Sequence, residues 1–489
     1  MPARALTVAA RRRAATGLLA ALLAVAAASL LSSGASASVA PTGTATGIAA
    51  LVNPNAVNAG AFGNAIAATA DGGALIAGET LTGLQSYEGW VGKLGANLSL
   101  GSQRQLGCGS SVLSSIAVSA DGGYVAAGGS NGCAAGCASG GFGSLNCAWV
   151  VKVSAAGALQ WQDVYPAAFQ ASAAQIAATS DGGFVVAGST SSAAGVTYAW
   201  IAKLSSAGAT QWQRRVGPGS FAEGRSVRQT SDGGYILTGS TGFIGKSSAL
   251  VVKLSASGAL QWQRTLGAGY LVDGESVSQT ADGGYIVSGT DALEVPFGPQ
   301  YDALLVRLTS TGTVSWQRRY DVGEHCAEER GCSYPASDAR SVIETAGGNF
   351  VIGGYTSFFV SAQAPGSASW LAMTDANGKL LWSNDYYALN NSTGLPYASA
   401  FSGLIATAGG FEAAGYTDEY RSSDNIWIVK TDGNGQVSSC AEQHAARLET
   451  YGAALRESSK SIPTKATVAA GVAVTGGPVP SNLSATRDC

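Results

Sequence analysis

One stretch of the chain gathers the side-chain types that acid/base chemistry requires. It runs from Asp321 to Cys332 and contains His325, one of only two histidines in 489 residues. A general acid or base works when a titratable group is held beside a second one, and this stretch offers His325 together with Asp321 and Glu328. We therefore take Asp321, His325 and Glu328 as candidate catalytic residues, although no Gly-x-Ser-x-Gly phrase accompanies them.

Polar and aromatic residues around this stretch are candidates for ligand contact. A disulfide between Cys326 and Cys332 would make the loop rigid and present its charged residues in a small arc. The neighbouring insertion, from Asp291 to Asp302, is expected to leave from the same edge of the fold, so its residues are included among the candidates. The candidate ligand-binding residues are Asp291, Glu294, Tyr301, Glu324, Arg330, Tyr334 and Asp338. The alternative is that this charged loop is solvated surface with no chemical role.

A repeat of about fifty residues must position these side chains. Its mark is an Asp-Gly-Gly turn between two apolar stretches, in which Asp bonds the backbone ahead and Gly takes positive φ. One carboxylate per turn falls short of the oxygen ligands that calcium needs, so these residues are interpreted as turn formers. The turns begin at Asp71, Asp121, Asp181, Asp232 and Asp282, with looser copies at 347 and 409.

Each repeat predicts four short strands separated by glycine-bearing turns, which is one blade of an antiparallel propeller. All ten tryptophans fall into two columns of the repeat, which favours packing between blades over an aromatic cage. A column of Lys and Arg on the third strand is interpreted as a solvated face or a set of snorkelling stems. The tryptophans are Trp90, Trp149, Trp200, Trp370 and Trp427 on the third strand, and Trp161, Trp212, Trp262, Trp316 and Trp382 on the fourth.

We expect an all-β fold, a seven-bladed β-propeller of four-stranded antiparallel blades, over residues 41–440. The segment from Gly47 to Val52 resembles a fourth strand and is expected to complete the last blade, whose own fourth strand is weak. Residues 441–489 form a C-terminal tail that is partly helical or extended.

The blade phrases resemble a known family. At Gly188-Ser-Thr190, Gly239-Ser-Thr241 and Gly258-Ala-Leu-Gln-Trp262 the chain resembles the secreted seven-bladed β-propeller repeat proteins of bacteria, of the SBBP type. The resemblance covers about residues 41–440, implies the fold and an extracellular location, and supplies no catalytic motif. The last phrase is also similar to the tryptophan-docking repeat of quinoprotein dehydrogenases. Those enzymes usually have eight blades, calcium ligands and adjacent cysteines. This chain has one repeat fewer and no adjacent cysteines, so no cofactor is expected here.

The N-terminal residues have the composition of an export signal. Arginines at 11–13 precede an Ala, Leu and Val run, and small residues follow up to 37, so residues 1–37 are interpreted as a signal peptide. The export route stays open. A secreted location, extracellular or periplasmic, makes the eight cysteines disulfide candidates rather than metal ligands. We expect Cys326 to pair with Cys332 and Cys440 with Cys489, while Cys108, Cys133, Cys137 and Cys147 pair among themselves in an order that is open.

Charge and composition exclude some partners. With 28 basic and 31 acidic residues the chain lacks the basic surface that nucleic acid requires. No stretch after the signal is apolar for long enough to span a membrane, and a monomer is expected. Two functions remain: a secreted binding or scaffold protein that recognises a glycan or peptide on the face of variable loops, or a propeller enzyme, a lyase or glycoside hydrolase, that acts on polysaccharide.

Overall fold

The computed structural model describes most of the repeat region and four short pieces of the tail. The described stretches are 47–51, 60–83, 86–107, 109–131, 147–165, 170–192, 194–217, 221–243, 246–267, 271–295, 298–321, 325–327, 331–333, 336–361, 364–387, 397–418, 425–437, 456–458, 464–466, 472–473 and 479–480. The predicted signal peptide and the predicted helical part of the tail, near 445–449, lie outside them.

The described elements are all β-strands, and consecutive strands pair antiparallel in groups of four. The repeat's alternation of β-branched or aromatic stretches with glycine turns accounts for this pattern. The first three groups are β2 (Ala61–Ala68), β3 (Ala74–Gly83), β4 (Ser86–Leu94), β5 (Leu100–Leu106); β6 (Ser111–Val118), β7 (Tyr124–Ser130), β8 (Cys147–Val153), β9 (Leu159–Tyr165); and β10 (Gln170–Ala178), β11 (Phe184–Ser191), β12 (Thr197–Leu204), β13 (Thr210–Val216).

The same order continues along the chain. The next groups are β14 (Ala222–Gln229), β15 (Tyr235–Phe243), β16 (Lys246–Leu254), β17 (Leu260–Leu266); β18 (Leu271–Gln279), β19 (Tyr285–Val295), β20 (Gly298–Leu308), β21 (Val314–Asp321); and β24 (Ala336–Glu344), β25 (Phe350–Ser361), β26 (Ala364–Thr374), β27 (Leu380–Tyr386). A single parallel pairing, Ser247 with Leu271, links the β14–β17 and β18–β21 groups into one larger sheet. Between β21 and β24 lies a small hairpin of β22 (His325–Ala327) and β23 (Gly331–Ser333).

The last group draws on both ends of the repeat region. Strands β28 (Ser399–Thr407), β29 (Gly410–Thr417) and β30 (Asn425–Asp432) come from its end, and β1 (Gly47–Leu51) pairs antiparallel with β30. The segment beginning at Gly47 thus pairs at the edge of the last group, where the sequence predicts a fourth strand. Four short tail strands pair with earlier groups: β31 (Arg456–Ser458), β32 (Thr464–Ala466), β33 (Val472–Ala473) and β34 (Val479–Pro480).

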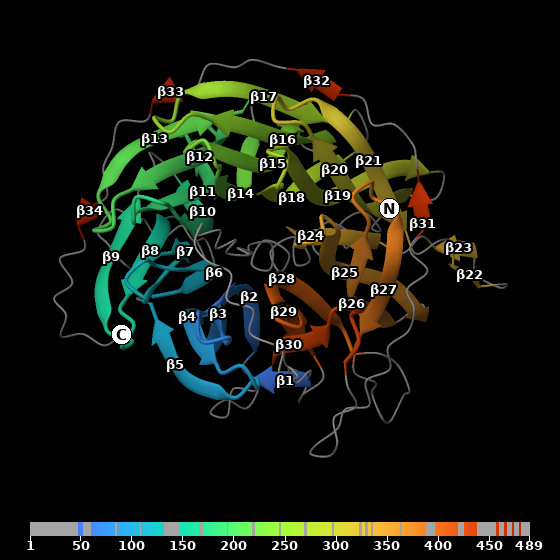
Figure 1. The fold of residues 1–489 in the computed structure, drawn as a ribbon, viewed down its shortest axis with the longest axis horizontal. Coiled ribbons are helices and arrows are strands. Elements are labelled where there is room, and N and C mark those ends of the chain that lie inside the picture. The colour runs from blue at the N-terminus through green and yellow to red at the C-terminus, as the bar shows by residue number, and fades with distance from the viewer. Residues whose placement is uncertain are drawn as a thin grey trace, which may run out of the picture.

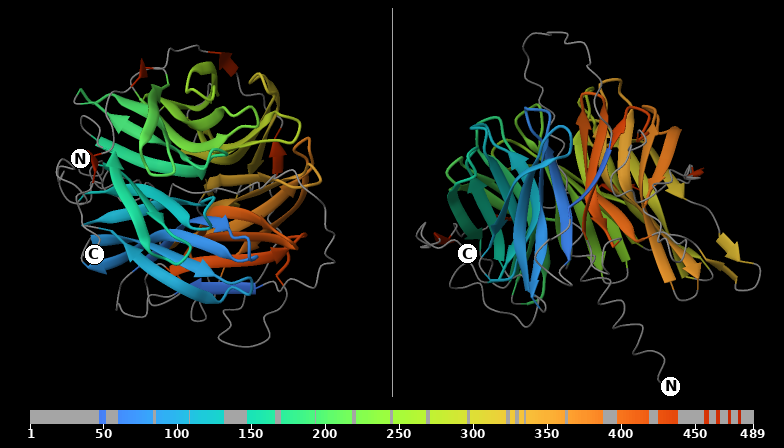
Figure 2. Two further views of the ribbon diagram at one scale, coloured as in Figure 1. Left: turned by 60° about the vertical axis from the view of Figure 1, so that its left-hand side comes forward. Right: turned by 90° about the horizontal axis from the view of Figure 1, so that it is seen from below.

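The groups stand around a common axis, which gives a propeller-like all-β fold (Figure 1). The first strand of each group, here called the innermost strand, lies nearest the axis; these are β2, β6, β10, β14, β18, β24 and β28. Two further views show the groups packed face to face around the ring (Figure 2). Each apolar core lies between neighbouring groups, and one core joins Ile66 and Ile76 of the first group to Ile426 and Ile428 of the last.

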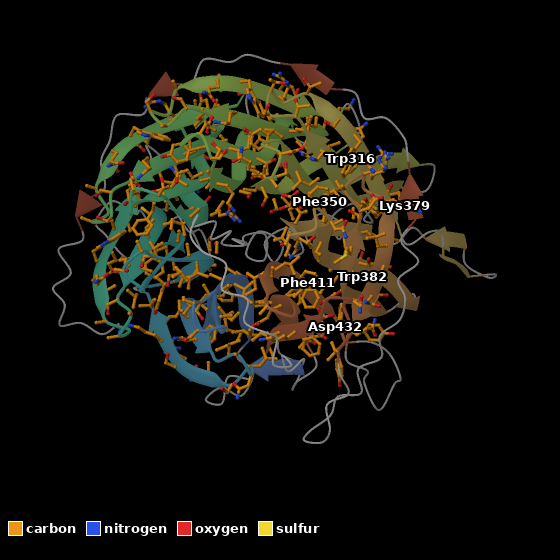
Figure 3. All side chains as sticks on the ribbon, in the orientation of Figure 1. Trp316, Phe350, Lys379, Trp382, Phe411 and Asp432 are labelled. Atoms are coloured by element: carbon orange, nitrogen blue, oxygen red, sulfur yellow. The ribbon has the colours of Figure 1, made fainter. Side chains whose placement is uncertain are left out.

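Aromatic pairs hold neighbouring groups together, as the tryptophan columns predicted. Trp316 lies 6.0 Å from Phe350 of the next group, and Trp382 lies 6.2 Å from Phe411 (Figure 3). Trp262 also packs beneath the turn glycine Gly312, where an added Cβ would come within 2.9 Å of the indole. That glycine has a φ of 78°, so the turn and the packing both favour glycine.

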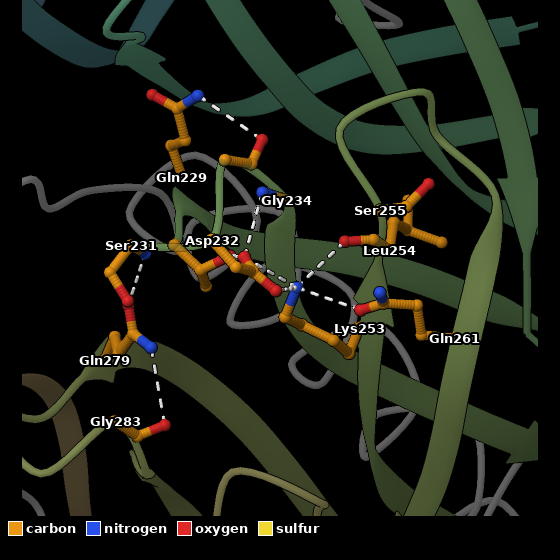
Figure 4. A network of polar contacts seen from close by, with 12 residues as sticks. Gln229, Ser231, Asp232, Gly234, Lys253, Leu254, Ser255, Gln261, Gln279 and Gly283 are labelled. Carbon is orange, nitrogen blue, oxygen red and sulfur yellow. Dashed lines mark hydrogen bonds and ion pairs between the residues drawn. The ribbon is translucent and has the colours of Figure 1, made fainter.

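The Asp-Gly-Gly turns are locked by the lysine column. Asp232 accepts a bond from the Gly234 amide at 2.9 Å, and Lys253 reaches the same carboxylate at 2.8 Å (Figure 4). Lys253 also donates to Gln261 at 3.0 Å, and its side chain is 3% exposed. The interpretation of this column as a solvated face is wrong for Lys152, Lys203 and Lys253, because their ammonium groups are buried against turn carboxylates.

Candidate functional site

A β-bulge recurs at one place on every innermost strand. The pairing of innermost and second strands slips by one residue there, which leaves one residue out of the ladder. A bulge re-aims the side chain that it carries, and bulges are frequent beside functional sites. The bulged residues are Asn64, Ser114, Ala174, Arg225, Glu275, Arg340 and Ser402.

Three of these bulged residues are charged, and they lie on the successive innermost strands β14, β18 and β24. Two positions before each bulge on these strands stands a carboxylate. Together they form what we call the inner charged cluster: Glu223, Arg225, Asp273, Glu275, Asp338 and Arg340.

Arg225 links the first two strands of this cluster. Its Nε donates to Glu223 Oε1 at 2.8 Å, and its Nη2 reaches the same oxygen at 2.5 Å. The same guanidinium pairs with Glu275 and lies 4.0 Å from Asp273 on the adjacent strand. Asp273 also accepts a bond from Ser247 at 2.9 Å. One arginine thus contacts three carboxylates contributed by two neighbouring groups of strands.

Asp338 and Arg340 extend the cluster onto β24. Thr290 of the preceding sheet donates to Asp338 Oδ1 at 2.6 Å, and Arg340 Nε donates to Oδ2 at 3.2 Å. The guanidinium of Arg340 lies over the ring of Tyr355, 4.6 Å from its centroid. Burial raises the pKa of Tyr355 to about 12, so its hydroxyl stays protonated at neutral pH.

Burial and mutual attraction set the protonation of the cluster. Burial raises the pKa of Glu275 to about 8, although Arg225 opposes this shift. Burial disfavours the charge of Arg225, but the carboxylates of Glu275, Glu223 and Asp273 raise its pKa above the usual value. Burial likewise disfavours the charge of Arg340, but the carboxylate of Asp338 raises its pKa above the usual value. The cluster therefore contains permanently charged guanidinium groups beside one carboxyl that titrates near neutral pH.

Glu223 and Asp273 are the members best placed to meet a ligand. Their side chains are 24% and 29% exposed, against 5% for Glu275. Both residues stand near the start of their strands. Two kinds of connection leave from this same end of each antiparallel group: those between successive groups and those between the second and third strands. The variable-loop face and the exposed carboxylates therefore coincide.

Other sheets show that the fold does not need charge at these positions. The residues equivalent to Glu223, Asp273 and Asp338 are Phe62, Val112, Ser172 and Ala400. Phe62 forms an edge-on pair with Tyr416, 5.6 Å away, so apolar and aromatic side chains occupy this part of the ring. Burying ionisable groups costs free energy, and three members of the cluster, Glu275, Asp338 and Arg340, are buried. This cost makes the inner charged cluster a candidate functional site.

The predicted catalytic stretch lies elsewhere. Asp321 ends β21 and His325 begins β22, and the β22–β23 hairpin projects from the periphery of the ring, away from the innermost strands (Figure 1). The structure thus separates this hairpin from Asp338, which lies in the inner charged cluster. The other predicted residues of this stretch, Glu324, Glu328, Arg330 and Tyr334, lie outside the described residues, and the catalytic assignment stays a prediction.

The neighbouring insertion is placed in part. Asp291 is fully buried and pairs with Arg319 of the outer strand β21, and burial raises the pKa of its carboxyl despite that arginine. Tyr301 lies on β20 opposite Ala292. Nothing is described for the side chain of Glu294, whose backbone belongs to β19.

The cysteines are described only in part. Cys147 is disulfide-bonded. Cys326 and Cys332 stand opposite each other in the β22–β23 register, and their predicted bond stays a prediction. Cys108, Cys133, Cys137, Cys440 and Cys489 lie outside the described residues. Among the described residues, no three His, Cys, Asp or Glu side chains gather as a metal site would require. No helix of the described chain is long and apolar enough to cross a membrane.

Sequence reasoning missed most of the inner charged cluster, although a signal was available. The phrases Glu223-Gly-Arg225-Ser, Asp273-Gly-Glu275-Ser and Asp338-Ala-Arg340-Ser occupy the same place in three consecutive repeats. Aligning the repeats by their turns would have shown two charged columns there.

No family model matches the sequence. No curated protein matches it either. Among solved structures the chain is similar to a protein of unknown function from Dyadobacter fermentans DSM 18053, at TM-score 0.40 and 8% identity over 78% of this chain and 98% of that chain. It is also similar to Chaetomium thermophilum Sqt1 bound to the N-terminus of the ribosomal protein L10 (TM-score 0.39, 10%, 76% and 97%) and to a PL25 polysaccharide lyase, an ulvan lyase (TM-score 0.38, 11%, 78% and 96%).

Proposed function

We propose that the protein is a secreted seven-bladed β-propeller that binds a glycan through the inner charged cluster. The seven-bladed ring is supported by the groups of four strands, by the pairing of β1 with β30, and by the apolar core between the first and last groups. Export is supported by the composition of residues 1–37 and by the bonded state of Cys147.

The observation that carries the proposal is the placement of Glu223 and Asp273. Both are partly exposed. Glu223 accepts hydrogen bonds from Arg225, and Asp273 accepts one from Ser247 and lies 4.0 Å from Arg225. Carboxylates fixed in this way accept hydrogen bonds from ligand hydroxyl groups without losing further conformational entropy. Phe62, at the position equivalent to Glu223, and its ring partner Tyr416 offer apolar faces for sugar rings. A glycan presents both hydroxyl groups and apolar ring faces.

A glycan array and a peptide array probed with the mature protein test this proposal. We expect binding to glycans that is lost in a Glu223→Gln/Asp273→Asn variant and kept in a His325→Ala/Glu328→Ala variant. The second variant removes the predicted catalytic residues of the peripheral hairpin, so it separates the two sites. Binding lost only in the hairpin variant would move the site to that hairpin, and binding to peptides alone would contradict the choice of ligand.

An enzyme acting on polysaccharide is the second candidate, and Glu275 favours it. Burial raises the pKa of the Glu275 carboxyl, and a raised pKa is what a general acid requires. Asp273 on the same strand would serve as its partner carboxyl. Release of reducing ends, or of unsaturated uronate products, from any glycan that binds would establish turnover. We expect Glu275→Gln to abolish that turnover while binding remains.

A further inference from the structure

The tail strands follow the outside of the ring at a fixed step. Strands β31, β32, β33 and β34 pair with the outer strands β21, β17, β13 and β9, in that order. The tail therefore travels backwards around the ring, and Figure 1 shows these short strands spaced along its periphery. Each covers the free edge of an outermost strand, which would otherwise present unpaired backbone groups.

The register of these pairings repeats every seven residues. Each of the outer strands β9, β13, β17 and β21 has one residue that pairs with the third-strand tryptophan of its group, or with the leucine that replaces this tryptophan in two groups. These residues are Val164, Arg215, Thr265 and Arg319, opposite Trp149, Trp200, Leu250 and Leu304. The tail residues that face these outer-strand residues are Val479, Val472, Lys465 and Ser458. The numbers of these tail residues differ by seven from one to the next, so the tail advances by seven residues for each group of strands that it passes.

The next outer edge in this direction is that of β5. Its equivalent position is Gln105, which faces Trp90 of the third strand. A further step of seven from Val479 reaches Thr486, within the last residues of the chain. The outer edge of β5 carries Leu100, which is 38% exposed, and no tail strand among the described residues covers it.

We propose that residues 485–489 bind the outer edge of β5 with Thr486 opposite Gln105, so that the tail forms a belt around the ring. The length of the tail supports this. Cys440 and Cys489 are 49 residues apart, which at seven residues per sheet is one circuit of seven sheets. The count of one full circuit rests on the seven-bladed ring proposed above. The proposed contact with β5 rests only on the seven-residue step between the four tail strands. The belt ends beside the sheet where it began.

The belt brings Cys489 back toward Cys440, the partner expected from sequence, and a bond between them would fasten it. The two thiols lose two protons and two electrons, one Sγ–Sγ bond forms, and a small-molecule disulfide of the oxidised-glutathione class is reduced to two thiols. Such a bond stabilises chiefly by restricting the unfolded chain.

Hydrogen exchange of the full-length protein tests the β5 contact. A variant that ends at Pro480 keeps every described strand and loses only residues 481–489. We expect the edge amides of β5 to exchange at least about tenfold faster in this variant, while those of β17 are unchanged. Equal exchange of β5 in the two proteins would overturn the proposal.

Two matched proline pairs test the register. Proline cannot donate to a ladder, so Ala485→Pro/Thr486→Pro should accelerate exchange of β5 as the truncation does. The control pair, Asn482→Pro/Leu483→Pro, lies between the residues that pair with β9 and those expected to pair with β5. It should therefore leave the amides of β5 protected. The same effect from both pairs would contradict the seven-residue register. Peptide mapping of the oxidised protein should find Cys440 linked to Cys489, and a free thiol or another partner at Cys489 would overturn the belt's fastening.

Discussion

Glu79 should make the protein less stable as pH rises. Its carboxyl is fully buried on β3, opposite Phe62, and accepts one hydrogen bond from Asn64. Its second oxygen has no hydrogen-bond partner among the described residues. Burial raises the pKa of Glu79 from 4.5 to about 8, and the single bond from Asn64 offsets only part of this. The folded protein therefore holds a proton that the unfolded chain releases above pH 4.5.

The sign and size of the effect follow from linkage. A carboxyl with a raised pKa contributes its full stability below the unfolded pKa and loses it as pH rises toward the folded pKa. Each pH unit in that window lowers the free energy of unfolding by about 1.4 kcal/mol. Between pH 4.5 and 7.5 the loss from Glu79 is about 4 kcal/mol.

Urea unfolding of the wild type and a Glu79→Gln variant, measured from pH 4.5 to 8, tests this reasoning. Glutamine keeps the shape of the protonated carboxyl and cannot ionise, so the variant should match the wild type near pH 4.5 and exceed it by about 4 kcal/mol at pH 7.5. A Glu88→Gln variant, on the neighbouring strand, serves as the control and should follow the wild type. Parallel profiles for Glu79→Gln and the wild type would refute the buried, protonated state.

Two further predictions concern the contacts that hold the sheets. Gly312→Ala should cost about 1–3 kcal/mol more in urea unfolding than Gly157→Ala, because both glycines have positive φ but only Gly312 lies against an indole, that of Trp262; equal costs would contradict the packing argument. Lys253→Met should cost about 1–3 kcal/mol, because it removes charged hydrogen bonds from a buried ammonium. Lys93→Met should cost less than about 1 kcal/mol, because that pair is half exposed, and the reverse order would refute the burial argument.

Local signals in the sequence predicted the repeating architecture. The glycine turns and the tryptophan columns depend on residues within one repeat, so their spacing alone indicates four-strand groups packed through indoles. The charged columns of the inner charged cluster could be read from aligned repeats, but its contacts could not, because Arg225 meets Glu275 only when two neighbouring groups pack. The burial of the lysine column was missed for a different reason. Asp232 and Lys253 lie 21 residues apart in one repeat, and they meet only when β15 pairs with β16.

The most direct test of the proposed function is a calorimetric titration of the best-bound glycan into three proteins at pH 7. These are the wild type, the Glu223→Gln/Asp273→Asn variant and the Glu88→Gln control. Loss of two oriented carboxylates, each accepting hydrogen bonds from ligand hydroxyl groups, should weaken binding by about a hundredfold or more in the double variant. The control should keep the wild-type affinity. Wild-type affinity in the double variant would contradict the assignment of the inner charged cluster as the binding site.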